Sequence, residues 1–154
     1  PWHWQTDQSG HGTPNGTNGP MDLHADEDVS GVSAHEARAY AAWAAARGEG
    51  LAGAVPQHEY QWEVAARLGK LELNGRCWEW CANSYHPYPA YQAPADPALE
   101  PFPIDREGIT LRGGCLHTQA TLRRTTLRIM GAPEQRNLFA GTRLVMPPGR
   151  AAWE

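Results

Sequence analysis

Residues 74–91, NGRCWEWCANSYHPYPAY, constrain the fold of this chain more than any other stretch. At the periodicity of a strand, Trp78 and Trp80 point to one face and Glu79 to the other. Pro87 and Pro89 then prevent the strand from continuing, because proline lacks an amide donor and restricts the residue before it. The stretch therefore predicts a buried aromatic strand followed by a rigid aromatic loop.

Length and composition favour one α+β domain with much irregular structure. The 154 residues are enough to bury a core, and 16 glycines and 13 prolines predict short elements separated by long loops. The formal net charge of −4 argues against a nucleic-acid partner, and no apolar run is long enough to cross a membrane. The three cysteines form no CxxC pair, which argues against a zinc site and a disulfide framework. We expect a soluble, cytoplasmic protein.

Two helices are predicted in the first half of the chain. Ser33 and Glu36 form a capping box at the start of a helix over residues 34–46. The expected inner face of this helix is Ala37, Tyr40, Ala41 and Ala44, with Trp43 alongside. A second helix is expected over residues 57–68, with inner residues Trp62, Ala65, Ala66 and Leu68.

Short strands should supply the rest of the regular structure. We expect strands at residues 2–4, 76–82, 109–112, 125–130 and 142–146. The Gly- and Asn-rich stretch 9–19 and the proline-rich stretch 87–103 are expected to be loops. Two helices followed by scattered strands predict an α+β fold.

Motifs spread over residues 32–145 have a recognisable order and spacing. They are Val32-Ser33, Glu36-Ala37, Tyr40, Trp43, Pro56, Glu59, Trp62-Glu63, Gly75, Trp78-Glu79-Trp80, Leu111-Arg112-Gly113-Gly114, Phe139-Ala140-Gly141 and Arg143-Leu144. Together they resemble the formylglycine-generating-enzyme-like domain. This resemblance implies that residues 1–154 adopt a loop-rich variant of the C-type-lectin fold, with two short helices and irregular antiparallel strands.

Three short runs of sequence point to one group of proteins within this resemblance. The run WEWCAN at residues 78–83 with HPYP at 86–89, and the run RNLFAG at 136–141, are most similar to the iron-dependent sulfoxide synthases of ergothioneine biosynthesis. Within these, the first two runs are most similar to the selenoneine synthases. The resemblance implies an iron(II)- and oxygen-dependent enzyme that forms a C–Se or C–S bond on the imidazole of hercynine. The second substrate would be a selenosugar or a thiol donor.

The resemblance also implies that the iron is held by another domain. In that family an N-terminal DinB-like domain supplies three histidines to iron(II), so this chain would be the C-terminal half of a longer polypeptide. None of its seven histidines forms an HxxxH or HxxE pair on an expected helix, and a non-heme iron site needs a facial set of ligands. We therefore predict no metal ligand in this chain.

Aromatic and basic residues are the candidate substrate contacts. Aromatic faces would attract the quaternary ammonium of hercynine, and arginine would bind its carboxylate. Tyr88 and Tyr91 are the candidate catalytic residues, because a phenol is an acid at neutral pH and could deliver a proton. The candidate substrate-binding residues are Tyr85, Phe102, Arg128, Met130, Gly131, Gln135 and Arg136.

Residues 127–141 depart from the pattern of the ergothioneine synthases. Ile129, Met130 and Gly131 stand where that family has polar or aromatic substrate contacts. Either the pocket is rebuilt for a different thiol, selenol or sulfur donor, or the domain no longer catalyses.

Two other functions are compatible with the same fold. One is a ligand-binding module without catalysis, like the variable binding proteins of diversity-generating systems. The other is a copper-dependent formylglycine generator, which needs two reactive cysteines after the Gly-Gly motif, whereas only Cys115 follows it here. We expect Cys115 to be a buried thiol and Glu79, Arg112 and Arg143 to be structural.

Overall fold

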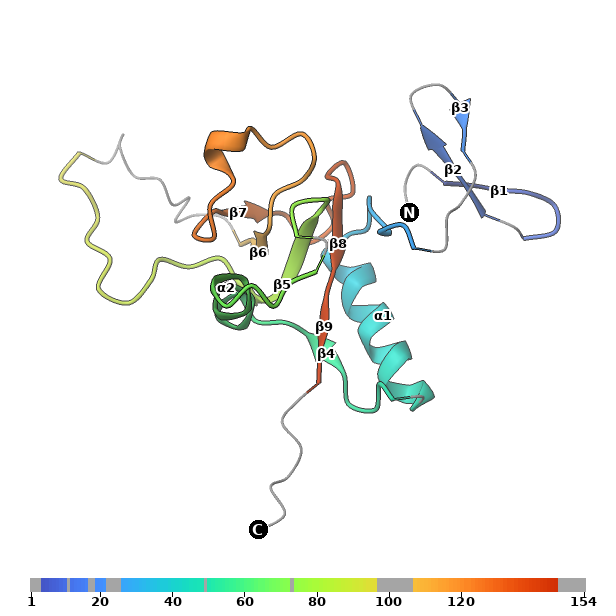
Figure 1. Cartoon of the computed structure of the whole chain (residues 1–154), viewed down its shortest axis with the longest axis horizontal. Coiled ribbons are helices and arrows are strands. Elements are labelled where there is room, and N and C mark those ends of the chain that lie inside the picture. The colour runs from blue at the N-terminus through green and yellow to red at the C-terminus, as the bar shows by residue number, and fades with distance from the viewer. Residues whose placement is uncertain are drawn as a thin grey trace, which may run out of the picture.

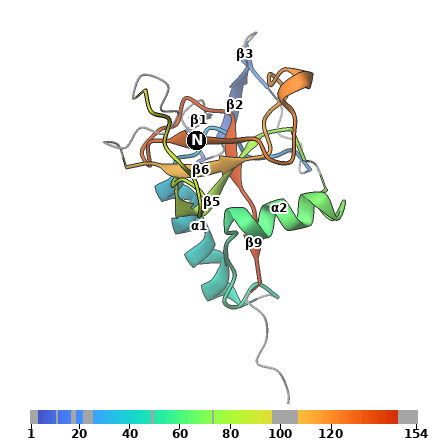
Figure 2. The same cartoon turned by 90° about the vertical axis from the view of Figure 1, so that its left-hand side faces the viewer.

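The aromatic run forms part of β5 (Trp78–Ser84), an inner strand of a four-stranded sheet in the computed structural model of the chain. The structure describes residues 4–10, 12–16, 19–21, 26–48, 50–72, 74–96 and 107–146. Within these ranges, helices α1 (Ala34–Arg47) and α2 (Glu59–Arg67) lie below the four-stranded sheet in both views (Figures 1 and 2). The predicted α+β class is confirmed for this part of the chain.

The four-stranded sheet has the order β7-β6-β5-β8. β5 pairs antiparallel with β6 (Ile109–Arg112) and parallel with β8 (Ala140–Thr142), while β7 (Arg128–Gly131) pairs antiparallel with the other side of β6. The predicted antiparallel pairing is thus correct for most of this sheet, and the β5–β8 pair differs. A register shift between Trp80 and Ser84 marks where β5 begins to leave the regular ladder.

Two smaller antiparallel sheets complete the strands of the described residues. One contains β1 (Trp4–Thr6), β2 (Gly12–Gly16) and β3 (Gly19–Pro20), and it lies at one side of the molecule (Figure 1). The other pairs β4 (Val55–Pro56) with β9 (Leu144–Val145).

The strand predictions at the two ends of the chain need correction. The expected loop 9–19 is wrong over β2, where glycine lets a ring approach the backbone: a Cβ at Gly12 would lie 2.8 Å from the Trp4 ring. The expected strand 2–4 overlaps β1 only at Trp4, and residues 1–3 lie outside the described residues. The strand expected over 142–146 is divided into β8 and β9 by Arg143, whose side chain turns to Glu79.

The capping box of α1 is present as predicted, but the inner face of this helix differs. Ser33 Oγ accepts from the Glu36 amide, and the Glu36 carboxylate accepts from the Ser33 amide. The buried residues are Ala34, Ala37, Ala41 and Ala44. Tyr40 is 50% exposed, so its assignment to the inner face was wrong, and Trp43, expected alongside that face, is 54% exposed. The small alanines form the packed side of the helix. The Tyr40 and Trp43 rings lie outside this side and contact each other, with their centroids 5.7 Å apart.

Helix α2 begins later than predicted because His58 caps it. The His58 side chain accepts from the Tyr60 amide, and the Gln61 side chain accepts from the His58 amide. Trp62 is buried as expected, whereas Leu68 follows the last helical residue and is 67% exposed.

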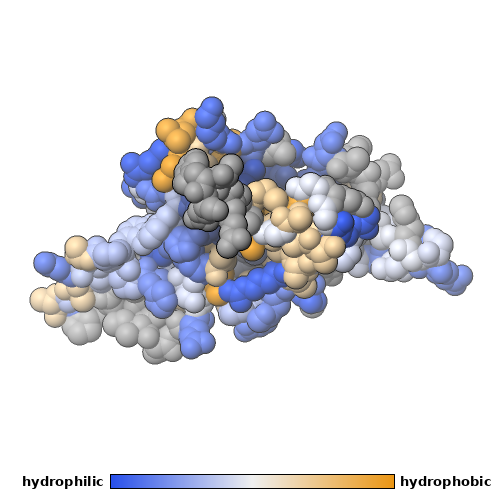
Figure 3. Space-filling view, turned by 90° about the horizontal axis from the view of Figure 1, so that it is seen from below, coloured by the Kyte–Doolittle hydropathy of each residue, from blue (hydrophilic) through white to orange (hydrophobic). Residues whose placement is uncertain are grey.

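Seen from below, the surface of the molecule has hydrophilic and hydrophobic residues interspersed (Figure 3). Within the described ranges, no helix is long and apolar enough to cross a bilayer.

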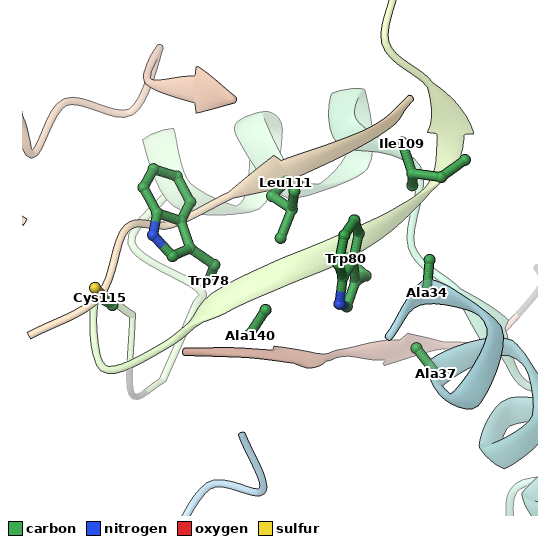
Figure 4. Packing of buried hydrophobic residues seen from close by; sticks show 8 residues of the cluster. All are labelled: Ala34, Ala37, Trp78, Trp80, Ile109, Leu111, Cys115 and Ala140. Carbon is green, nitrogen blue, oxygen red and sulfur yellow. The ribbon is translucent and has the colours of Figure 1, made fainter. Parts of the chain in front are cut away.

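The hydrophobic core lies on the face of β5 that carries both indoles, as predicted. Its buried members are Ala34, Ala37, Trp78, Trp80, Ile109, Leu111, Cys115 and Ala140 (Figure 4). Trp80 Nε1 donates to the Val32 carbonyl at 2.8 Å, so the buried indole is satisfied. A Cβ at Gly131 would lie 2.6 Å from the Trp80 ring, so glycine at this position lets β7 pack closely on the core.

Candidate functional site

The tyrosine loop, residues 85–91, leaves the end of β5 and forms the candidate site wall. The Tyr85 amide donates to the Gly108 carbonyl at 2.8 Å, which ties the start of the loop to the residue before β6. The loop has no regular structure beyond a turn in which Ala90 has a φ of 69° and the Tyr91 amide donates to the Tyr88 carbonyl at 3.0 Å. This agrees with the predicted end of the strand.

Arg128 of β7 contacts both tyrosines at the start of this loop. Its guanidinium carbon lies 4.2 Å from the Tyr85 ring centroid and 4.5 Å from that of Tyr88. Nη1 donates to the His86 carbonyl at 2.7 Å, and Nη2 donates to Glu59 at 2.8 Å. The structure thus brings three predicted site residues together, but the arginine already provides the cation that the two rings attract.

Glu59, the first residue of α2, is the centre of this cluster and is only 3% exposed. Its Oε1 accepts from Asn83 Nδ2 at 2.9 Å and from Arg128. Its Oε2 accepts from the Tyr88 hydroxyl at 3.3 Å and lies 3.5 Å from Arg112 Nη1. A buried carboxylate is costly unless it is paired and hydrogen-bonded, and here both oxygens are.

Arg112 of β6 forms the inner side of the cluster with a fully buried side chain. Its Nη1 donates to the Tyr88 hydroxyl at 3.1 Å, and its Nη2 donates to Glu63 and to the Thr125 carbonyl, both at 2.6 Å. Its guanidinium carbon lies 5.0 Å from the Trp62 ring centroid. These contacts agree with the structural role predicted for Arg112.

Both tyrosines of the cluster stay protonated over a wide pH range. Burial raises the pKa of the Tyr88 phenol, Glu59 raises it further, and Arg112 acts in the opposite direction. Burial also raises the pKa of Tyr85, which Arg128 lowers and Glu59 raises. The Tyr88 hydroxyl, which accepts from Arg112 and donates to Glu59, is therefore a neutral group that can transfer a proton only if this pair of hydrogen bonds rearranges.

The remaining predicted site residues lie in other surroundings. Met130 covers Gly108, and Gly131 packs on the core. Gln135 closes the turn after β7, since its Oε1 accepts from the Ala132 amide at 3.3 Å. Tyr91, which is 36% exposed, lies at the outer end of the tyrosine loop. Phe102 lies outside the described residues.

Arg136 lies at the N-terminus of α1 rather than in the tyrosine cluster. It pairs with Glu36 at 3.0 Å, and its side chain is 46% exposed. The pair borders an open depression of about 650 Å³, lined by Ser33, His35, Glu36, Ala39, Glu134, Arg136 and Asn137. Burial alone would raise the pKa of Glu36, but hydrogen bonds from Ser33 and the charge of Arg136 outweigh it, and the pKa is lowered.

Glu59 was missed as a candidate from the sequence. Its only sequence signal was its place among the motif residues, because its partners come from β5, β6, β7 and the tyrosine loop. Pairing of charges that are 53 to 69 residues apart cannot be read from local spacing.

The described residues do not fit an iron site by themselves. Within the described ranges, no group of three His, Cys, Asp or Glu side chains is placed to hold a metal ion. The two buried carboxylates, Glu59 and Glu79, are both bound by arginine. No catalytic step through iron is therefore derived from these residues.

Two of the three cysteines are placed as unreactive thiols. Cys77, Cys81 and Cys115 are free, and the last two are buried. Burial raises the pKa of Cys77 to about 11, with further contributions from Asp28 and Glu79. Burial likewise raises the pKa of Cys81. Because the thiolate is the reactive form, Cys77 and Cys81 are poorly placed for thiol redox chemistry.

Comparison with known proteins gives one informative similarity. No protein-family model matches the chain. The chain is 28% identical over 160 aligned positions to hercynine oxygenase of Mycobacterium tuberculosis (strain ATCC 25618 / H37Rv). The alignment covers 80% of this chain and 37% of that protein, so the chain spans little more than a third of its relative. This similarity supports the predicted relationship to the ergothioneine-synthase family.

Proposed function

We propose that this chain is one domain of an iron(II)- and oxygen-dependent enzyme that forms a C–Se or C–S bond on the imidazole of hercynine. The observation that carries the proposal is the similarity to hercynine oxygenase over 80% of the chain. The runs WEWCAN and HPYP favour selenoneine synthesis over ergothioneine synthesis by resemblance. The fold we propose is the loop-rich C-type-lectin-like one, which is supported by the two short helices, the mixed sheet and the irregular loops.

The iron in this proposal is bound by a DinB-like domain that is not among these 154 residues. One observation supports the division of labour: the alignment covers only 37% of the length of the relative. Bound iron(II) would supply the activation of oxygen. The present domain would bind hercynine and the selenosugar or thiol donor, exclude water and hold a proton near the reacting groups.

The tyrosine loop is the wall that this domain contributes. Tyr88 is the first candidate for the proton donor because its phenol is neutral and already lies in a hydrogen-bonded pair. Tyr91 is the second candidate, at the C-terminal end of the loop and exposed to a similar extent as Tyr88. Both nitrogens of the Arg128 fork donate within the protein, so Arg128 contributes by holding Tyr85 and Tyr88 in place.

The other proposed substrate contacts lie along β7 and the segment after it. Arg136 is the most exposed of the predicted arginines and could exchange Glu36 for the carboxylate of hercynine. Ile129, Met130 and Gly131 mark the part of the pocket in which this chain differs from the ergothioneine synthases, and Gln135 and Phe102 are the remaining candidate contacts.

The test is turnover by a polypeptide that joins this chain to its DinB-like domain. The protein is loaded with iron(II) without oxygen and is then given oxygen, hercynine and either a selenosugar or γ-glutamylcysteine. We expect mass spectrometry to detect a product with a new C–Se or C–S bond on the imidazole for one of the two donors. Absence of product with both donors would contradict the enzymatic function, and hercynine binding without turnover would favour a ligand-binding module.

A further inference from the structure

Glu59 joins four segments that are distant in the sequence. Its carboxylate contacts Asn83 of β5, Arg112 of β6, Arg128 of β7 and Tyr88 of the tyrosine loop. Its amide also donates to Asn83 Oδ1 at 2.9 Å, so the first turn of α2 is fixed against the end of β5. This backbone contact therefore fixes the position of Glu59 independently of its contacts with the loop.

Two of these contacts determine where the tyrosine loop lies. Arg128 uses one nitrogen for Glu59 and the other for the His86 carbonyl, so its fork connects the carboxylate to the backbone of the loop. The Tyr88 hydroxyl donates to the same carboxylate. The orientation of both Arg128 and Tyr88 thus depends on Glu59, and a planar fork with two acceptors tolerates little displacement.

We propose that Glu59 is a positioning residue that holds the tyrosine loop in the geometry of the candidate active-site wall, acting through Arg128 and Tyr88. The importance of this positioning role for catalysis rests on the proposed function. The positioning itself can be measured without turnover. A side chain that contacts substrate is held in a precise position only if the neighbouring residues that bind it are themselves fixed. Glu59, on helix α2, is such a neighbour for Arg128 and Tyr88.

Glu63, one turn further along α2, provides a matched control. It accepts from Arg112 Nη2 at 2.6 Å and from Arg67 Nη2 at 2.7 Å. It therefore shares the buried arginine and the helix with Glu59, but its ion pairs are with Arg112 and Arg67 rather than with Arg128. Loss of charge at Glu63 disturbs Arg112, which contacts the Tyr88 hydroxyl, but it leaves intact the Arg128 fork that connects Glu59 to the loop backbone.

The experiment compares amide hydrogen exchange in the 154-residue chain with Glu59→Gln or Glu63→Gln, under conditions in which both variants are folded. The amides of Tyr85 and Tyr91 are hydrogen-bonded and report on the loop. We expect Glu59→Gln to accelerate their exchange by roughly 10-fold or more relative to amides of β5 and β6, and Glu63→Gln to leave this ratio unchanged. Equal ratios in the two variants would overturn the proposal.

A spectroscopic readout separates positioning from general loosening. The charged groups that face the Tyr88 phenol are Glu59, Arg112 and Arg128, and the Tyr60 ring lies 5.9 Å away. In chains with isotope-labelled tyrosine, Tyr88→Phe identifies its NMR signal. Glu59→Gln should move the ionisation of Tyr88 to lower pH, whereas Glu63→Gln should not. An unchanged titration in Glu59→Gln would contradict the assignment.

If Glu59→Gln does not fold, Arg128→Lys tests the same connection. Lysine keeps the positive charge but lacks the fork that bonds Glu59 and His86 together. We expect the same faster exchange at Tyr85 and Tyr91, and exchange as in the unmodified chain would overturn the proposal. Because neither readout requires hercynine, a failed turnover assay with a released loop would reject the proposed function while leaving the positioning role in place.

Discussion

Glu59 and Glu79 are two carboxylates buried to the same extent, with 3% and 4% exposure, yet their partners lead to different parts of the molecule. Glu79 accepts from Arg143 Nε at 2.8 Å and Nη2 at 3.0 Å, and from Gln57 Nε2 at 2.6 Å. These donors flank β4 and β9, so the pair fastens the small sheet to β5. Glu59 instead contacts the tyrosine loop. The two acids are equally buried, so their partners alone distinguish the acid that stabilises the fold from the acid that contacts the candidate site.

The two clusters also differ in how far their arginines are removed from water. The side chains of Arg112 and Arg128 are 0% and 8% exposed, whereas that of Arg143 is 31% exposed. An arginine left without its acid is costly in proportion to its burial, since water can replace the partner only at an exposed site. Disruption should therefore cost more at Glu59 than at Glu79.

The largest effect is expected for Glu59→Ala, which leaves two buried guanidinium groups without their shared acid. We expect the free energy of unfolding to fall by about 3–5 kcal/mol, because removing one partner of a buried ion pair leaves the other uncompensated. Urea denaturation of the chain measures this loss. A decrease below about 1 kcal/mol would show that the burial of the cluster has little energetic consequence.

A smaller loss is expected for Glu79→Ala. Arg143 can turn partly to water, so we expect about 1.5–3 kcal/mol, the range for hydrogen bonds to charged groups. The exchange of the Tyr85 and Tyr91 amides should keep its ratio to the exchange of core amides. Selective acceleration of the loop in this variant would contradict the distinction between the two acids.

Tyr88→Phe tests the link from the Glu59 cluster to the loop with less disturbance. The variant removes the hydroxyl that accepts from Arg112 and donates to Glu59, while the ring can still contact Arg128. The bond to Glu59 is long at 3.3 Å, so we expect a loss of about 0.5–1.5 kcal/mol in thermal unfolding, the range for one typical hydrogen bond. A loss above this range would mean that Tyr88 supports the core as well as the loop.

The smallest effect is expected for Arg136→Ala, which removes an ion pair with two exposed partners. Such pairs contribute ~0–1 kcal/mol. The pKa of Glu36 lies below its ordinary value of 4.5, so its contribution to stability is present above that pH and is lost as the pH falls through the lowered pKa. Arg136→Ala should weaken this acid-side dependence in thermal unfolding from pH 5 to pH 2, and an identical profile would contradict the pairing.

Local sequence patterns predicted the elements better than the contacts between them. The Ser33–Glu36 capping box fixes the start of α1, and the alternation of Trp78, Glu79 and Trp80 fixes the two faces of β5. Both signals are contained within a few residues. Tyr40 was wrongly predicted to be buried because helical periodicity selects a whole side of α1. The part of that side that packs on the core is narrower and is occupied by alanines.

The candidate site was only partly visible in the sequence for a related reason. Tyr85, Tyr88 and Arg128 were expected near substrate, and the structure brings them together. Arg128 lies on β7, whereas Tyr85 and Tyr88 follow β5. Their contact depends on the position of β7 two strands from β5 in the sheet, which no local sequence pattern reveals. Glu59, the residue that the cluster shares, became visible only when α2 was placed against the sheet.

A double-mutant cycle between Glu59→Gln and Tyr88→Phe, read as the exchange rate of the Tyr85 and Tyr91 amides, tests the central claim most directly. If Glu59 holds the loop partly through Tyr88, the double variant should accelerate exchange by clearly less than the product of the two single effects. Strictly multiplicative effects would mean that the two residues act on the loop independently, and that result would contradict the positioning role of Glu59.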